Sequence, residues 1–179
     1  MKAGSLYLAA RFTIQIRRQK PKYVSGESHY FQGVPYQLCV VERKGNARVV
    51  FRRNKTIELH INPRSNATRR ERALVNWYRV YLKKTIPPLI KKWEKIIGVE
   101  VAEWGVKRMR TRWGSCNPNA RRIWLNLELA KKSPECLEYV VVHEMVHLLE
   151  HSHNRRFKEL LSQFLPRWRS IRKELKQMV

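Results

Sequence analysis

The chain has 179 residues and a formal net charge of +24, with 43% hydrophobic and 10% aromatic residues, which indicates a folded, strongly basic domain rather than a disordered tail. All 14 acidic residues are glutamates, since the sequence contains no aspartate. This composition excludes an aspartic dyad, aspartyl-phosphate chemistry, a Ser-His-Asp triad and a magnesium site built from aspartates.

Residues 6–62 are predicted to be mainly β. Apolar and polar residues alternate over 12–17, which is typical of a half-buried strand. Two apolar runs on either side of Gly33 predict a hairpin. A second pair of strands is predicted over 47–53 and 56–62.

The hydrophobic period becomes helical from about Thr68. Pro87 and Pro88 are predicted to kink or restart this helix, and Gly98 is predicted to end it. The apolar stripe of the helix is rich in aromatic residues and consists of Leu74, Trp77, Tyr78, Tyr81 and Leu82.

Two short strands are predicted over 106–113 and 122–126, joined by a turn over 114–119. Ser133, which is followed by a proline and a glutamate, predicts the N-cap of a further helix. A basic helix from about Asn154 and a last helix complete the chain.

These elements predict an α+β fold in which a β-rich segment, 1–62, forms one compact unit with residues 63–179. The cysteines are scattered and form no CxxC pair, so they are expected to be reduced thiols in the cytoplasm; they are Cys39, Cys116 and Cys136. No apolar run approaches the length of a membrane span.

The most specific motif is an HExxH, formed by His143, Glu144 and His147 in the helix that starts after Ser133. Residues four apart lie on one face of a helix with Cβ atoms about 5–6 Å apart, so the two imidazoles can bind a single zinc ion. Glu144 can reach the metal-bound water as a general base. The alternative is a core helix with two satisfied histidines.

A catalytic zinc site needs a third protein ligand and an open position. His151 continues the four-residue spacing, but lies about 12 Å along a helix axis from His143, too far to share one ion. His153 is favoured, provided that the helix ends near Glu150 and the chain reverses. A later glutamate, Glu159 or Glu174, is the alternative.

Four pieces of the sequence carry a resemblance to a known family: residues 23–31, 112–116, 123–127, and the HExxH with His153 and Phe157. They closely resemble the YgjP-like metallopeptidase family, from about residue 23 to the C-terminus. The chain is also similar to SprT-type and WLM-type zinc peptidases, which act on proteins attached to DNA.

The resemblance implies one zinc ion per chain, held by His143, His147 and His153, with Glu144 as the catalytic acid and base. It also implies a zincin-like fold, with the active-site helix packed on a small antiparallel sheet whose edge strand can align an extended peptide. An N-terminal β-hairpin region and C-terminal helices would flank this core.

Arg112 lies in the run Arg-Trp-Gly-Ser-Cys, which is predicted to stand beside the metal. Its guanidinium could hold a carboxylate or a phosphate, or stabilise a developing oxyanion. The alternative is a tight turn at Gly114 with Trp113 packed in the core.

The net charge predicts attraction to DNA or RNA. Residues 64–95 hold ten basic and two acidic residues, interleaved with aromatic ones, a combination that suits phosphate contact with base stacking. The alternative is that the aromatic rings are core and the cations are solvated. The candidate contacts are Arg69, Arg70, Arg72, Lys83 and Lys84.

The sequence therefore predicts a cytoplasmic zinc-dependent metallohydrolase. The favoured interpretation is a metallopeptidase that cleaves a protein or peptide substrate by Glu-assisted attack of zinc-bound water. Its expected targets are proteins near nucleic acid. One alternative is a metal-dependent nucleoside-triphosphate pyrophosphohydrolase, an activity that has been attached to relatives. Another is a nucleic-acid-binding module with a structural zinc ion.

Overall fold

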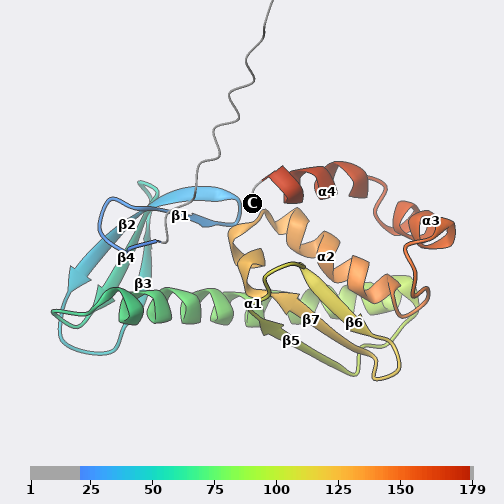
Figure 1. Ribbon diagram of the computed structural model, residues 1–179, viewed down its shortest axis with the longest axis horizontal. Coiled ribbons are helices and arrows are strands. Elements are labelled where there is room, and N and C mark those ends of the chain that lie inside the picture. Colours follow the sequence, from blue (N-terminus) through green and yellow to red (C-terminus); the bar gives the residue numbers. More distant parts are fainter. Residues whose placement is uncertain (1–20, 178–179) are drawn as a thin grey trace, which may run out of the picture.

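The structure, a computed structural model, describes residues 21–177 of the chain. The strand predicted over 12–17 lies outside the described residues. Within them the fold is α+β, as predicted, with two small β-sheets and four α-helices (Figure 1). A short 3-10 helix, η1 (Leu127–Lys131), leads into the second α-helix.

The predicted hairpin at Gly33 and the predicted second pair of strands are both present in the first sheet. They pair β1 (Ser28–Phe31) with β2 (Val34–Glu42), and β3 (Arg48–Arg52) with β4 (Thr56–Ile61), each in antiparallel register. The order is β1-β2-β4-β3, and β2 and β4 run parallel, so this sheet is mixed. Alternate residues of β4, such as Leu59, are buried on one face, as the period of a strand requires.

The second sheet differs from the prediction in its strand positions and in its directions. It consists of β5 (Glu103–Lys107), β6 (Gly114–Asn117) and β7 (Arg122–Asn126) in the order β5-β7-β6. The predicted strand over 106–113 is therefore largely wrong, and the predicted turn over 114–119 contains β6 instead. The sheet is also mixed rather than antiparallel, because β5 runs parallel to β7.

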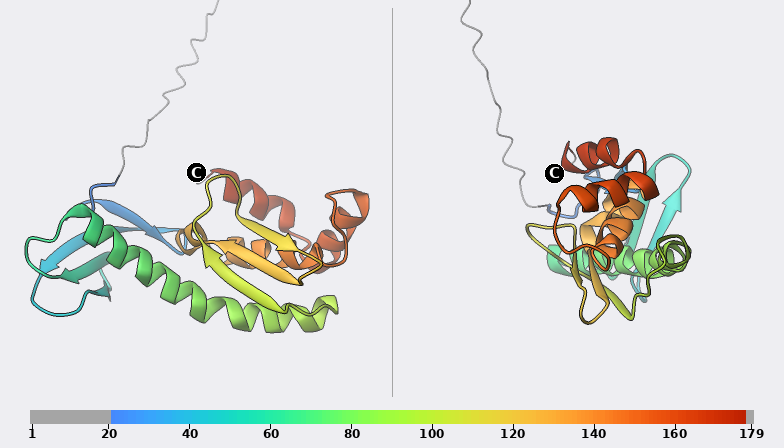
Figure 2. Two further views of the ribbon diagram at one scale, coloured as in Figure 1. Left: turned by 60° about the horizontal axis from the view of Figure 1, so that its bottom comes forward. Right: turned by 90° about the vertical axis from the view of Figure 1, so that its right-hand side faces the viewer.

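The long helix α1 (Ala67–Ile97) runs along both sheets (Figures 1 and 2). Gly98 ends it in the left-handed conformation, at φ 76°, as predicted. The predicted restart at Pro87 and Pro88 is wrong, because the helix continues through both residues. Both prolines lie on the exposed face of the helix. Because proline has no backbone N–H, the carbonyl groups one turn earlier lack their helical donor, but on this face they can bind water. The opposite face continues to pack, through Leu82, Ile86 and Ile90.

Most aromatic rings of α1 belong to the core. Tyr78 and Trp93 are buried, and the rings of Trp77 and Tyr81 lie 4.6 and 4.7 Å from the ring of Phe31 in β1. These rings therefore pack α1 against the first sheet. This is the alternative given in the sequence analysis, in which the aromatic rings belong to the core.

The helix with the HExxH, α2 (Pro134–Val146), lies between the second sheet and the C-terminal helices α3 (Arg155–Phe164) and α4 (Trp168–Gln177) (Figures 1 and 2). It packs against β6 and β7 on one side, and against α3 and α4 on the other. The hairpin turn at Gly33 donates a backbone hydrogen bond to the end of η1, just before α2 begins. Among the described residues, no helix has the length and apolar character needed to cross a membrane.

Candidate metal centre

The ends of α2 are set by local sequence. The Ser133 hydroxyl accepts a hydrogen bond from the backbone N–H of Cys136 at 3.3 Å, as an N-cap does. The helix ends at Val146, and the Asn154 side chain then caps α3 by accepting from the N–H of Phe157 at 3.0 Å. The chain therefore reverses between the two helices, which brings His153 back toward α2.

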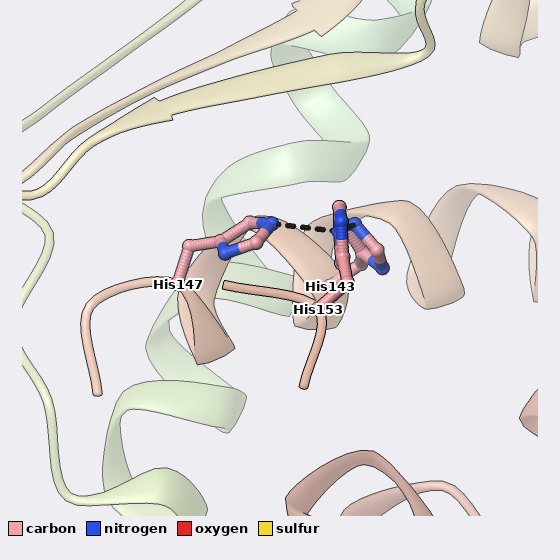
Figure 3. A group of neighbouring side chains, drawn as sticks. All are labelled: His143, His147 and His153. Atoms are coloured by element: carbon pink, nitrogen blue, oxygen red, sulfur yellow. Dashed lines mark hydrogen bonds between the residues drawn. The ribbon is translucent and has the colours of Figure 1, made fainter. Parts of the chain in front are cut away.

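Three imidazole rings converge at this reversal (Figure 3). The Nε2 atom of His153 lies 2.9 Å from Nε2 of His143 and 3.1 Å from Nε2 of His147. Two metal–nitrogen bonds of about 2.0–2.1 Å at a tetrahedral angle place their nitrogens about 3.3 Å apart. These two distances therefore fit a single small metal ion, and the possible ligand atoms of all three residues lie within 4.8 Å of one another.

The protonation state of His147 also suits a metal ligand. Its Nδ1 lies 3.1 Å from the backbone carbonyl of Glu150, to which it can only donate. A neutral imidazole carries one proton, so this hydrogen bond leaves Nε2 with a free lone pair directed at the other two rings. A backbone carbonyl that orients a ligand in this way is a common outer partner of metal-binding histidines.

The three rings rest on Phe157, which is 1% exposed. Its ring lies 5.0, 4.6 and 4.7 Å from the rings of His143, His147 and His153, respectively. Burial, followed by the neighbouring His147 and His153, lowers the pKa of His143 to about 3. His143 is therefore uncharged at neutral pH, as binding of a cation requires.

Glu144 lies beside the triad at the bottom of the cleft and is 5% exposed. Burial raises the pKa of this carboxyl to about 8, although the positive charge of Arg112 opposes the shift. A pKa raised in this way is typical of carboxyl groups that exchange protons in catalysis. Gly114, at the start of β6, allows the strand to approach, because a Cβ there would lie 2.5 Å from Oε1 of Glu144.

We expect Gly114→Ala to impair activity more than stability. The added methyl group must displace the Glu144 side chain, and overpacking of this kind costs about 1–3 kcal/mol. The control is Gly98→Ala, which adds a Cβ with nothing within 4 Å but strains a backbone at φ 76°, at a cost of about 1–3 kcal/mol. Denaturant unfolding should show similar losses for both variants, and hydrolysis should fall only in Gly114→Ala. Equal activity in the two variants would contradict the proposed role of this close approach.

The triad opens into a cleft of about 980 Å³. One wall is formed by β6 and the residues that precede it, and the other by α3 and α4, with α2 between them. Several lining residues were not singled out in the sequence, among them Tyr139 and Arg172. The Tyr139 hydroxyl lies 3.5 Å from Nδ1 of His143, and its position one turn before His143 was the available signal.

The loop before β6 is organised by Asn126, which sequence reasoning also missed. This buried side chain donates to the backbone carbonyls of Met109 and Arg112, at 3.0 and 2.9 Å, and accepts from the N–H of Met109. The backbone N–H of Asn126 donates to the carbonyl of Trp113. One residue at the end of β7 therefore fixes the position of Arg112 and the start of β6.

The remaining predicted residues divide between the cleft and the outside of the molecule. Arg112 lines the cleft near Glu144, and Cys116 lies on β6 within it. Burial and the charge of Glu144 raise the pKa of Cys116 to about 11, so it is a thiol rather than a thiolate at neutral pH. None of the basic candidates on α1 lines the cleft; they are Arg69, Arg70, Arg72, Lys83 and Lys84.

The chain matches a family model described as "YgjP-like, metallopeptidase domain" over residues 8–178. This match begins 15 residues before the stretch in which the resemblance was visible, which started at about residue 23. Comparison with curated proteins finds no match. The His143, His147 and His153 cluster could hold the metal that such a domain requires. Since the model covers nearly the whole chain, the chain belongs to the YgjP-like metallopeptidase domain family.

Proposed function

We propose that the protein is a zinc metallopeptidase in which Glu144 assists the attack of water on a peptide carbonyl. The observation that carries this proposal is the convergence of three Nε2 atoms beside a buried carboxyl group. Imidazole nitrogens suit zinc, and three protein ligands are typical of catalytic rather than structural zinc sites.

The residues of the chain have distinct roles in this mechanism. His143, His147 and His153 would hold the zinc ion, which would supply a Lewis acid at this position. Glu144 accepts a proton from the attacking water at its carboxylate and returns it to the leaving amine. Arg112, which lines the same cleft and whose positive charge acts on Glu144, can stabilise negative charge that develops on the carbonyl oxygen.

The edge strand β6 offers a way to orient the substrate. It pairs with β7 on one side only, and its residues Gly114, Ser115 and Cys116 line the cleft. An extended peptide can add to such an edge through backbone hydrogen bonds. This arrangement, an HExxH helix beside a small sheet with a free edge, supports the zincin-like interpretation of the fold.

Metal removal tests the proposal. Dialysis against a chelator should abolish hydrolysis of an unfolded protein substrate, and addition of about one equivalent of Zn²⁺ should restore it. The same preparations should be incubated with nucleoside triphosphates. Zinc-dependent release of pyrophosphate, without peptide hydrolysis, would contradict the peptidase proposal and favour the pyrophosphohydrolase instead.

The pyrophosphohydrolase remains the second candidate because basic side chains line the cleft, which suits phosphates. Against it, Glu144 is the one carboxylate among the described lining residues, and magnesium nucleotides are usually bound through carboxylates. A structural zinc site would need a fourth protein ligand, whereas the described residues bring three together.

We also propose that the exposed face of α1 contacts DNA or RNA, in keeping with substrates near nucleic acid. Arg69, Arg72, Lys83 and Lys84 are exposed along this helix, whereas Arg70 is half-buried. Their separation along α1 allows contact with more than one phosphate. Free cysteines, which include buried Cys136, are compatible with the cytoplasm as the compartment.

Nucleic-acid binding should fall steeply with salt. Each phosphate contact that is lost reduces the slope of log K against log salt by about 0.9 for duplex DNA. Replacement of Arg69, Arg72, Lys83 and Lys84 by Gln should therefore flatten the slope, whereas Lys44→Gln, in the turn between β2 and β3, should leave it unchanged. Binding that is unaffected by salt, measured by fluorescence anisotropy, would contradict this proposal.

A further inference from the structure

The cleft beside the triad is lined by basic side chains from three separate elements. Arg112 comes from the loop before β6, Lys158 from α3, and Arg172 and Lys176 from α4. Among the described lining residues, the one acidic side chain is that of Glu144, at the bottom. The site is therefore positively charged even before a metal ion adds its own charge.

None of these four cations forms an ion pair within residues 21–177. Basic residues nearby do, since Arg155 pairs with Glu159 at 2.7 Å and Lys131 with Glu128 at 2.6 Å. Unpaired charges of one sign in a concave site concentrate ligands of the opposite sign.

The cations are placed where the substrate of a peptidase would lie. A peptide added to β6 would run along the cleft, which Lys158, Arg172 and Lys176 line from α3 and α4. Successive side chains of an extended peptide point in opposite directions, so alternate side chains would face these cations. Flexible, exposed lysine and arginine side chains can follow a carboxylate over several positions.

We infer that the cleft selects peptides that carry carboxylates close to the cleaved bond, an inference that rests on the proposed peptidase function. A peptide is favoured over a nucleotide because β6 offers backbone hydrogen bonds that match a peptide. The carboxylates can belong to acidic side chains or to a free C-terminus, and both present the same chemistry to a guanidinium or an ammonium group.

Matched peptides test the inference. One series replaces each glutamate near the cleaved bond by glutamine, and a second compares a free C-terminal acid with the amide. Each carboxylate recognised should raise kcat/KM roughly two- to fivefold, the range for exposed ion pairs. The preference should shrink as salt rises, because the Debye length falls to about 3 Å at 1 M. Equal cleavage of all peptides at low salt would overturn the inference and leave the peptidase proposal intact.

Variants assign the preference to the cleft. Arg172→Gln should reduce the preference for acidic peptides, and Arg172→Glu should reverse it in favour of lysine-containing peptides. Lys173→Gln removes a charge from the next position of α4, which does not line the cleft, and should change nothing. Lys158→Gln, on α3, gives an independent measurement if an Arg172 variant unfolds. An unchanged preference in folded Arg172→Gln and Lys158→Gln would overturn the inference, and zinc-dependent hydrolysis of nucleoside triphosphates alone would overturn it together with the peptidase proposal.

Discussion

Glu144→Gln should keep the fold and the metal but lose the hydrolytic activity. Glutamine has nearly the same shape as glutamate and can occupy the same buried position, which is 5% exposed. It cannot accept a proton at neutral pH, and general acid–base catalysis contributes about 10²–10⁴-fold to rates. We therefore expect kcat for peptide hydrolysis to fall by about this factor.

The measurement has two parts, the metal content of the purified variant and its kcat on a peptide. Glu135→Gln is the matched control, since Glu135 lies on the same helix but is exposed and outside the cleft. It should retain both the metal and the activity. A Glu144→Gln enzyme that works at a rate close to that of the wild type would show that another group moves the proton.

The second large effect is expected for His143→Ala, which removes the most buried of the three converging rings. The two remaining imidazoles, of His147 and His153, can supply two of the three bonds to the metal, so the ion is held less tightly. Loss of an outer hydrogen-bond partner already costs about 10–100-fold in metal affinity, and loss of a ligand should cost more. The zinc content, measured by metal analysis, should fall from about one ion per chain to a small fraction of that. The hydrolytic activity should fall with it.

His151→Ala is the control for metal content. His151 lies on the same reversal of the chain but is not one of the three residues that converge. Its zinc content should equal that of the wild type. If His143→Ala keeps its zinc, or if His151→Ala loses it, the ion is held by a different set of side chains.

The local part of the site could be predicted because its determinants are close in sequence. The spacing of His143 and His147 places both rings on one helical face, and the cap at Asn154 signals a new helix that brings His153 back. Likewise, the hairpin at Gly33 and the N-cap at Ser133 depend on a few adjacent residues, and both are confirmed.

The missed features depend on distant parts of the chain. The run over 114–119 has the composition of a turn, but pairing with β7 makes its first residues a strand. The same holds for α1, where packing of Ile86 and its neighbours outweighs the local cost of two prolines. Arg172 enters the cleft because α4 packs on α2, a contact that no local pattern predicts.

The reversal between α2 and α3 gives the third imidazole an additional consequence. His143 belongs to α2 and His147 is the residue at which that helix ends, whereas His153 belongs to the connection that leads into α3. An ion shared by all three would act as a cross-link between two parts of the backbone. The C-terminal helices α3 and α4 carry Lys158, Arg172 and Lys176. Binding of the ion would therefore also restrict the motion of the wall whose cations are proposed to bind substrate carboxylates.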